Sequence, residues 1–233
     1  MIKIYADGAN LDDMLTAYKS GSVQGFTTNP TLMRKAGIVD YEAFSAEVLS
    51  LISDLPISFE VFADDFDTMY RQALKIDSWG ENVYVKIPIS NTKGDSTVPL
   101  IKDLVAKGIK LNVTAILTLK QVEDVDLVLN AQVPSIVSVF AGRIADTGID
   151  PVPVMQKSSQ ILKAHSRAEL LWASPREVLN VYQAEECGCE IITLPPDILK
   201  KLGMRNKDLL ELSRETVQMF YDDSLKSGFQ IEC

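Results

Sequence analysis

The sequence predicts an α/β fold, and within that class a single (β/α)8 TIM barrel domain spanning residues 1–233. Short apolar runs alternate with longer amphipathic segments along the whole chain, which is typical of a parallel sheet whose strands are connected by helices. The strand-like runs number eight. Eight strand–helix units close into a barrel, whereas an open doubly wound sheet more often has five or six strands.

The elements follow one another in a regular order. The predicted strands are 2–6, 24–28, 57–63, 82–89, 109–115, 135–141, 169–173 and 189–194. The predicted helices lie near 10–18, 40–53, 65–78, 96–107, 118–130, 150–164, 175–186 and 206–226. Apolar residues at helical spacing, such as those within 40–53, indicate the helices. No glycine-rich phosphate loop follows the first strand, so the sequence does not favour nucleotide binding.

Composition excludes several classes of protein. A net charge of −9 argues against a general binder of nucleic acid or of anionic membranes. No run of apolar residues approaches the length of a transmembrane helix, and residues 1–7 are typical of a strand rather than of a signal peptide. We therefore expect a cytoplasmic protein.

The few cysteines and the single histidine restrict the possible chemistry. Cys187, Cys189 and Cys233 are predicted to be reduced thiols, because they are too few for a zinc site and no histidine lies near the first two. His165 stands in a polar stretch and is predicted to be an exposed residue at a helix end. Histidine-based nucleophile schemes and multi-histidine metal sites are therefore not expected, and no metal is predicted.

A lysine inside an apolar strand is the most informative residue. Side chains alternate along a strand, so Lys86 faces the opposite way from Val85 and Ile87 and is predicted to point into the barrel. Burial favours the neutral amine, which can attack a carbonyl carbon. The alternative is a lysine held in a buried salt bridge with Glu60 or Asp7.

Further polar residues stand at the predicted strand ends, where barrel enzymes carry their chemistry. Asp7 and Glu60 could move the protons that imine chemistry requires, or they could only neutralise Lys86. Asn29 and Asn112 could orient the amine and substrate hydroxyls, although Asn29 could also simply form an Asx turn before Pro30.

Two arginines follow the sixth and seventh strands, near the usual phosphate site of barrel enzymes. Arg143 and Arg176, together with Ser174 as the N-cap of the next helix, form a plausible phosphate cradle. The alternative for each arginine is a solvated surface charge.

The string Gly25-Phe26-Thr27-Thr28-Asn29-Pro30-Thr31 closely resembles the G-x-T-T-N-P-[ST] signature of the transaldolase family. The resemblance continues along the chain through the segments Ile4–Asp7, Phe59–Val61, Val85–Pro88, Leu111–Thr114, Phe140–Ile144, Ala173–Arg176 and Ile192–Pro195. The short length is similar to the compact subfamily that also contains fructose-6-phosphate aldolases.

The resemblance implies a role for each of these positions in a class I, Schiff-base aldolase-like barrel. Lys86 matches the Schiff-base lysine, Asp7 the acid–base group for the C3–C4 bond, and Glu60 with Thr114 and a water the proton relay. Asn29, Asn112, Ser138 and the Thr27 of the signature match the residues around the dihydroxyacetone moiety. Arg143, Ser174 and Arg176 match the phosphate-binding group. The resemblance implies no metal or organic cofactor, because the protonated imine is itself the electron sink.

Within the family, Glu60 and Phe140 resemble transaldolases, because the aldolases tend to carry glutamine and tyrosine there. The resemblance implies transfer of a dihydroxyacetone unit between sugar phosphates in the pentose phosphate pathway. The alternatives are an aldolase that releases free dihydroxyacetone and a catalytically silent barrel that binds a sugar phosphate. Compact members form pentamers or decamers, so we expect a homo-oligomer in which residues 206–233 dock on a neighbouring subunit; the alternative is a frayed tail.

Overall fold

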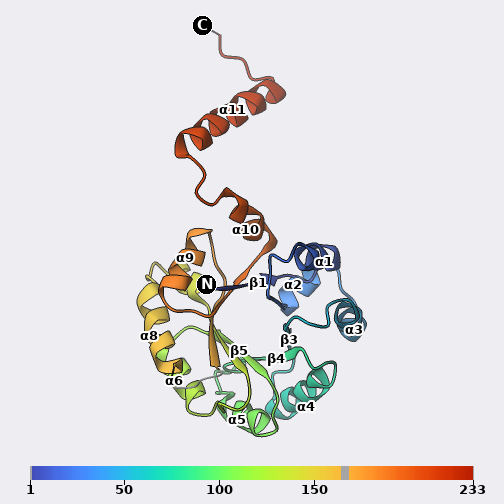
Figure 1. Cartoon of the computed structure of the whole chain (residues 1–233). Coiled ribbons are helices and arrows are strands. Elements are labelled where there is room, and N and C mark those ends of the chain that lie inside the picture. The colour runs from blue at the N-terminus through green and yellow to red at the C-terminus, as the bar shows by residue number, and fades with distance from the viewer. Residues whose placement is uncertain (1, 164–167, 233) are drawn as a thin grey trace. The chain divides into compact units, whose positions relative to one another are not determined.

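A computed structural model describes residues 2–163 and 168–232, and it confirms the predicted barrel. Its strands run parallel and pair in sequence order until the eighth closes on the first (Figure 1). They are β1 (Lys3–Asp7), β2 (Gly25–Thr27), β3 (Ile57–Glu60), β4 (Val83–Pro88), β5 (Leu111–Ile116), β6 (Ser135–Val139), β7 (Ala168–Trp172) and β8 (Ile191–Leu194). Each strand prediction is confirmed to within a few residues.

Helices surround the strands of the barrel (Figure 1). They are α1 (Leu11–Ser20), α2 (Pro30–Lys35), α3 (Tyr41–Leu51), α4 (Phe66–Asp77), α5 (Val98–Ala106), α6 (Leu119–Asp126), α7 (Ala141–Asp146), α8 (Val152–Leu162), α9 (Leu179–Glu186) and α10 (Pro196–Lys201). Side-chain oxygens cap several of them; Asn10, Asp40 and Asp65, for example, each accept a hydrogen bond from a backbone N–H three residues later.

The register of the strands brings side chains of the interior into one row. Glu60 of β3 pairs with Lys86 of β4, and Lys86 pairs with Asn112 of β5. Their neighbours Val85 and Ile87 are fully buried, as the alternation along β4 requires if they pack under the helices. The row therefore presents a carboxylate, an amine and an amide on three adjacent strands.

Three short helices differ from the prediction. α2, α7 and α10 follow β2, β6 and β8 almost directly, and each has six residues. A helix of that length shows fewer than two periods of an apolar repeat, so periodicity could not reveal it. The sixth strand ends at Val139 and not at residue 141 as predicted, because helix α7 already begins at Ala141.

The chain forms two compact units, Met1–Leu199 and Lys200–Cys233. The second contains the 3-10 helix η1 (Leu202–Met204) and the long helix α11 (Leu209–Ser227), which Asp208 caps at its start and Gly228 at its end. No residue of α11 is buried. Within residues 2–163 and 168–232, no helix is long and apolar enough to cross a membrane.

Candidate active site

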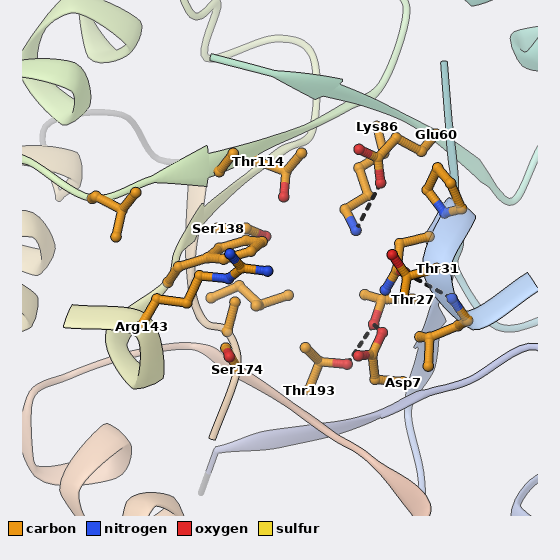
Figure 2. A pocket seen from close by; sticks show the side chains of 18 of the residues that line it. Asp7, Thr27, Thr31, Glu60, Lys86, Thr114, Ser138, Arg143, Ser174 and Thr193 are labelled. Atoms are coloured by element: carbon orange, nitrogen blue, oxygen red, sulfur yellow. Dashed lines mark hydrogen bonds and ion pairs between the residues drawn. The ribbon is translucent and has the colours of Figure 1, made fainter. Parts of the chain in front are cut away.

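A cavity of about 580 Å³ lies at the carboxyl ends of the strands (Figure 2). Ten of the twelve residues predicted for the site line it: Asp7, Thr27, Asn29, Glu60, Lys86, Thr114, Ser138, Phe140, Arg143 and Ser174. Asn112 and Arg176 do not line it. Residues named from the ends of seven strands and the loops that follow them thus lie around one cavity.

Lys86 is buried in the cavity wall, with 6% of its surface exposed. Its Nζ lies 3.2 Å from Glu60 Oε2 and donates a hydrogen bond of 3.0 Å to the carbonyl oxygen of Thr28. The buried ion pair that sequence reasoning offered as an alternative is therefore present. An amine held by two acceptors has a fixed position facing the cavity, and a carboxylate stands within proton-transfer distance of it.

Asp7 ends β1 in a chain of side-chain hydrogen bonds. Thr27 Oγ1 donates to Asp7 Oδ1 at 2.7 Å and lies 2.5 Å from Thr193 Oγ1. Because Thr27 has one hydroxyl proton, Thr193 donates to Thr27. Desolvation raises the pKa of Asp7 above its ordinary value, although the charge of Lys86 and the hydrogen bond from Thr27 oppose the shift. A carboxyl group with a raised pKa is suited to giving and taking a proton.

A second hydrogen-bonded chain runs behind the cavity wall. Asn112 is fully buried; its Oδ1 accepts a bond of 2.6 Å from Ser138 Oγ, and its Nδ2 donates one of 3.0 Å to Ser58 Oγ. The contact fixes the hydroxyl of Ser138, which does line the cavity. Asn112 thus does not line the cavity itself but holds the hydroxyl of Ser138, which does.

The end of β5 carries an unsatisfied hydroxyl. Thr114 Oγ1 is buried and has no hydrogen-bond partner within the described chain. The next residue, Ala115, has a positive φ of 61° where the register of β5 against β6 shifts. Buried hydroxyls are normally paired, so an orphan in a cavity wall is suited to bind water or substrate.

Asn29 makes a local hydrogen bond and also lines the cavity. Its Oδ1 accepts a hydrogen bond of 3.0 Å from the backbone N–H of Leu32, which caps α2. The local-turn alternative therefore describes its oxygen. Asn29 also lines the cavity.

Arg143 and Ser174 lie across the cavity from Asp7 and Thr27 (Figure 2). The guanidinium of Arg143 lies 5.6 Å from the centroid of the Phe140 ring, a cation–π contact. Ser174 has a positive φ of 60°. Its carbonyl oxygen approaches Gly142 so closely that a Cβ there would lie 1.5 Å from it, so the position requires glycine.

Two predictions about this region need correction. Ser174 is not the N-cap of the following helix, because α9 begins only at Leu179. Just before that helix, the backbone N–H groups of Arg176 and Glu177 donate hydrogen bonds to the side chain of Asn180. Arg176 turns to Asp146 and forms a two-pronged ion pair with it, Nε donating to Oδ1 at 3.0 Å. Both side chains are about half exposed.

Sequence reasoning missed several residues of the site. Thr193 and Lys35 line the cavity, and Asp146 holds Arg176. A threonine inside the apolar strand Ile191–Leu194 was a usable signal for Thr193. Lys35 carried none, because it stands at the end of the short helix α2 that was not predicted.

The remaining sequence predictions concern residues away from the cavity. Cys187 and Cys189 are buried free thiols, and burial raises the pKa of Cys187 to about 11. A thiol with so high a pKa is a poor nucleophile. His165 and Cys233 lie outside the described residues. No group of three or more metal-ligating side chains occurs in residues 2–163 and 168–232.

Comparison of the sequence with known proteins finds one family and several relatives. Residues 4–231 match the family described as Transaldolase/Fructose-6-phosphate aldolase. A "Probable transaldolase" of Roseiflexus castenholzii is 36% identical over 201 residues, covering 86% of this chain and 88% of the relative. A "Probable transaldolase" of Dehalococcoides mccartyi is 32% identical, covering 86% and 90%. "Probable transaldolase 2" of Listeria monocytogenes is also 32% identical, covering 86% and 88%.

Solved structures share the fold at low sequence identity. A 2,3-dimethylmalate lyase aligns with a TM-score of 0.59 at 12% identity, covering 98% of this chain and 84% of that one. A 3-keto-L-gulonate-6-phosphate decarboxylase of Vibrio cholerae aligns with a TM-score of 0.55 at 13% identity, covering 84% and 87%. Likeness at this level of identity supports the barrel fold and carries no argument about the reaction.

Proposed function

Because the chain belongs to the transaldolase/fructose-6-phosphate aldolase family, we propose that it is a transaldolase working through a Schiff base on Lys86. It transfers a dihydroxyacetone unit from fructose 6-phosphate or sedoheptulose 7-phosphate to glyceraldehyde 3-phosphate or erythrose 4-phosphate. One observation carries the proposal: a buried lysine amine lies 3.2 Å from Glu60 in the same cavity as Asp7. A barrel that only binds a sugar phosphate would have no use for Lys86, Glu60 and Asp7 together in one cavity.

Imine formation is the first step. The neutral Nζ of Lys86 attacks the C2 carbonyl of the ketose phosphate, and loss of water from the carbinolamine leaves a protonated imine. Glu60 takes the proton from the ammonium of Lys86 and returns it to the departing hydroxyl. Thr114 holds the water through which the proton passes, a role that fits its unpaired hydroxyl.

Cleavage of the C3–C4 bond follows. Asp7 removes the proton of the C4 hydroxyl, the aldehyde half leaves, and the bonding electrons move into the imine to give an enamine. The reverse step adds the enamine carbon to a second aldehyde, whose oxygen takes the proton from Asp7. The raised pKa of Asp7 suits a group that must act in both directions. The protonated imine accepts the electrons, so the scheme uses no metal or organic cofactor.

The far end of the substrate carries its phosphate. Arg143 and Ser174 face the cavity from the wall opposite Asp7, where an extended sugar phosphate held at Lys86 would place that group. Arg176 would join them only after leaving Asp146. Phe140 has no hydroxyl to position the water that frees dihydroxyacetone, so the enamine persists until an acceptor binds and transfer outruns hydrolysis. The proposed setting is the pentose phosphate pathway in the cytoplasm.

The proposed assembly is a homo-oligomer, a pentamer or decamer. Helix α11 carries large apolar side chains that its own unit does not bury, among them Leu210, Val217, Phe220 and Leu225. Residues 206–233 would cover them on a neighbouring subunit. Light scattering measures the mass in solution, and a value near the 25.8 kDa of one chain would contradict the proposal.

Borohydride trapping tests the reaction. The protein is incubated with fructose 6-phosphate, reduced with borohydride, and digested for peptide mass spectrometry. We expect a dihydroxyacetone adduct on Lys86, and an unmodified Lys86 in folded protein would contradict the Schiff base. A second assay follows release of glyceraldehyde 3-phosphate with and without erythrose 4-phosphate. Sustained turnover without the acceptor would identify the aldolase instead.

A further inference from the structure

A second, smaller cavity of about 230 Å³ adjoins the first. Residues from the end of β1 and from helices α1, α2 and α10 line it. Three residues line both cavities: Asp7, Leu32 and Lys35. The two cavities therefore share as a wall residue Asp7, which the proposed mechanism uses for proton transfer.

Small residues leave space for this second cavity, which we call the side cavity. Gly8 follows Asp7 directly, and a Cβ added there would meet no atom within 4 Å. Its φ is not in the left-handed region, so the backbone itself does not require glycine. Ala9 and Ala36 also line the space. The chain thus leaves a volume open beside Asp7 that ordinary side chains could fill.

The lining of the side cavity is mainly apolar. Met14 and Leu32 contribute aliphatic surface, and the two charged residues besides Asp7, Asp13 and Lys35, are exposed. An apolar interior with charges at its rim favours a hydrocarbon group over a phosphate, since a buried phosphate would need hydrogen-bonding and cationic partners there.

We propose that the side cavity is a second acceptor subsite, which takes the uncharged apolar tail of an aldehyde. The assignment rests on the proposed transaldolase function. In the transfer step the enamine carbon forms the new C–C bond with the aldehyde carbon, and the aldehyde oxygen takes the proton of Asp7. That oxygen must lie at Asp7, so the aldehyde carbon and the start of its tail lie beside a residue that lines both cavities.

Two kinds of acceptor thus use opposite directions. A phosphorylated aldehyde extends toward Arg143 and Ser174, which lie across the larger cavity from Asp7 (Figure 2). An alkyl aldehyde instead extends past Asp7 into the side cavity, which Gly8 and Leu32 line. The enzyme would accept both classes with one set of proton-transferring groups.

The test measures transfer from fructose 6-phosphate to propanal, butanal, pentanal and hexanal, with erythrose 4-phosphate as the phosphorylated reference. For the wild type we expect kcat/KM to rise about fourfold per methylene as each CH₂ is buried, until the side cavity is full. Gly8→Val fills the cavity from one wall and Ala36→Leu from another. Each should abolish the rise while retaining transfer to erythrose 4-phosphate.

Matched variants and folding measurements keep the result interpretable. Gly8→Ala adds one carbon and should reduce the rise only partly. Gly203→Val makes the same exchange as Gly8→Val at another open glycine, which belongs to η1 and lines neither cavity, and it should change nothing. Circular dichroism and Tm check each variant, and Ala36→Leu decides the question if Gly8→Val does not fold.

Each outcome has a distinct meaning. A wild type that transfers to erythrose 4-phosphate with no dependence on alkyl length overturns the subsite alone. A length dependence that survives in folded Gly8→Val and Ala36→Leu also overturns it. Absence of transfer to every acceptor overturns the proposed function, and the subsite with it.

Discussion

The two sides of the active cavity are built differently. On the amine side, which we define as Asp7, Thr27, Glu60, Lys86 and Thr193, every side chain contacts another member through a short polar contact. On the arginine side, defined as Phe140, Arg143, Ser174 and Arg176 with its partner Asp146, Arg143 rests on an aromatic ring and Arg176 is paired away from the cavity. The side chains of the amine side are therefore held in place before substrate binds, whereas the two arginines of the arginine side are exposed.

The difference corresponds to what each side must do. Proton transfer and covalent attack require positions held to fractions of an ångström, which buried hydrogen bonds provide. A phosphate carries a large charge that long, half-exposed side chains can reach by moving. We therefore expect substitutions on the amine side to lower kcat and those on the arginine side to raise KM.

Lys86→Met should have the largest effect. It keeps an unbranched side chain one atom shorter and removes the amine, so no imine can form, and kcat should fall roughly 10⁵-fold or more. Glu60 retains access to water, with 17% of its side chain exposed, so the variant should still fold. Lys75→Met removes an exposed lysine from an ion pair with Glu42 and is the matched control. Substantial turnover by Lys86→Met would contradict the covalent role.

Asp7→Asn should come next, lowering kcat by roughly 10²- to 10⁴-fold through loss of acid–base catalysis. It should also change stability. The pKa of Asp7 is raised in the folded state, so the folded protein binds more protons than the unfolded one between the ordinary and the raised pKa. Wild-type stability therefore falls as pH rises through that window, and remains lowered above it.

The asparagine carries no charge, so Asp7→Asn should lose this part of the pH dependence and have a higher Tm than the wild type at neutral pH. Thermal unfolding of both proteins across pH 4 to 8 checks the sign. Equal pH dependence in the two proteins would show that Asp7 is not the group responsible.

Four of these amine-side residues, Asp7, Thr27, Glu60 and Lys86, were singled out from the sequence, whereas Thr193 was not. Lys86 interrupts an apolar strand, and a charge in such a run has few explanations. Alternation along the strand then gave its direction, and the carboxyl ends of parallel strands gave its neighbours. The eight strands were also predictable, because each is a buried apolar run between polar segments.

The arginine side was less predictable, because its geometry depends on contacts between loops. Arg176 pairs with Asp146, thirty residues earlier, and no local pattern indicates that partner. Ser174 has a positive φ at the point after β7 where its carbonyl oxygen closely approaches Gly142. The helix α7 that carries Arg143 and Asp146 is too short to show a period.

Arg143→Ala should separate the two sides of the cavity. Loss of a charged hydrogen-bonding partner for phosphate should raise KM for fructose 6-phosphate roughly 10- to 100-fold, with a smaller change in kcat. The KM for fructose, which lacks the phosphate, should stay unchanged when it serves as donor. A fall in kcat alone would mean that Arg143 acts on the reacting atoms and would remove the distinction between the two sides.

Asp146→Ala should have the smallest effect, and its direction decides what Arg176 does. Because the guanidinium is paired with Asp146, it must leave that partner to reach a phosphate in the cavity. A half-exposed pair contributes at most about 1 kcal/mol, so releasing it should lower KM for fructose 6-phosphate by about fivefold or less. In an Arg176→Ala background the substitution should change nothing. If Asp146→Ala instead raises KM, then Asp146 holds Arg176 in place for the phosphate, and the arginine side is as fixed as the amine side.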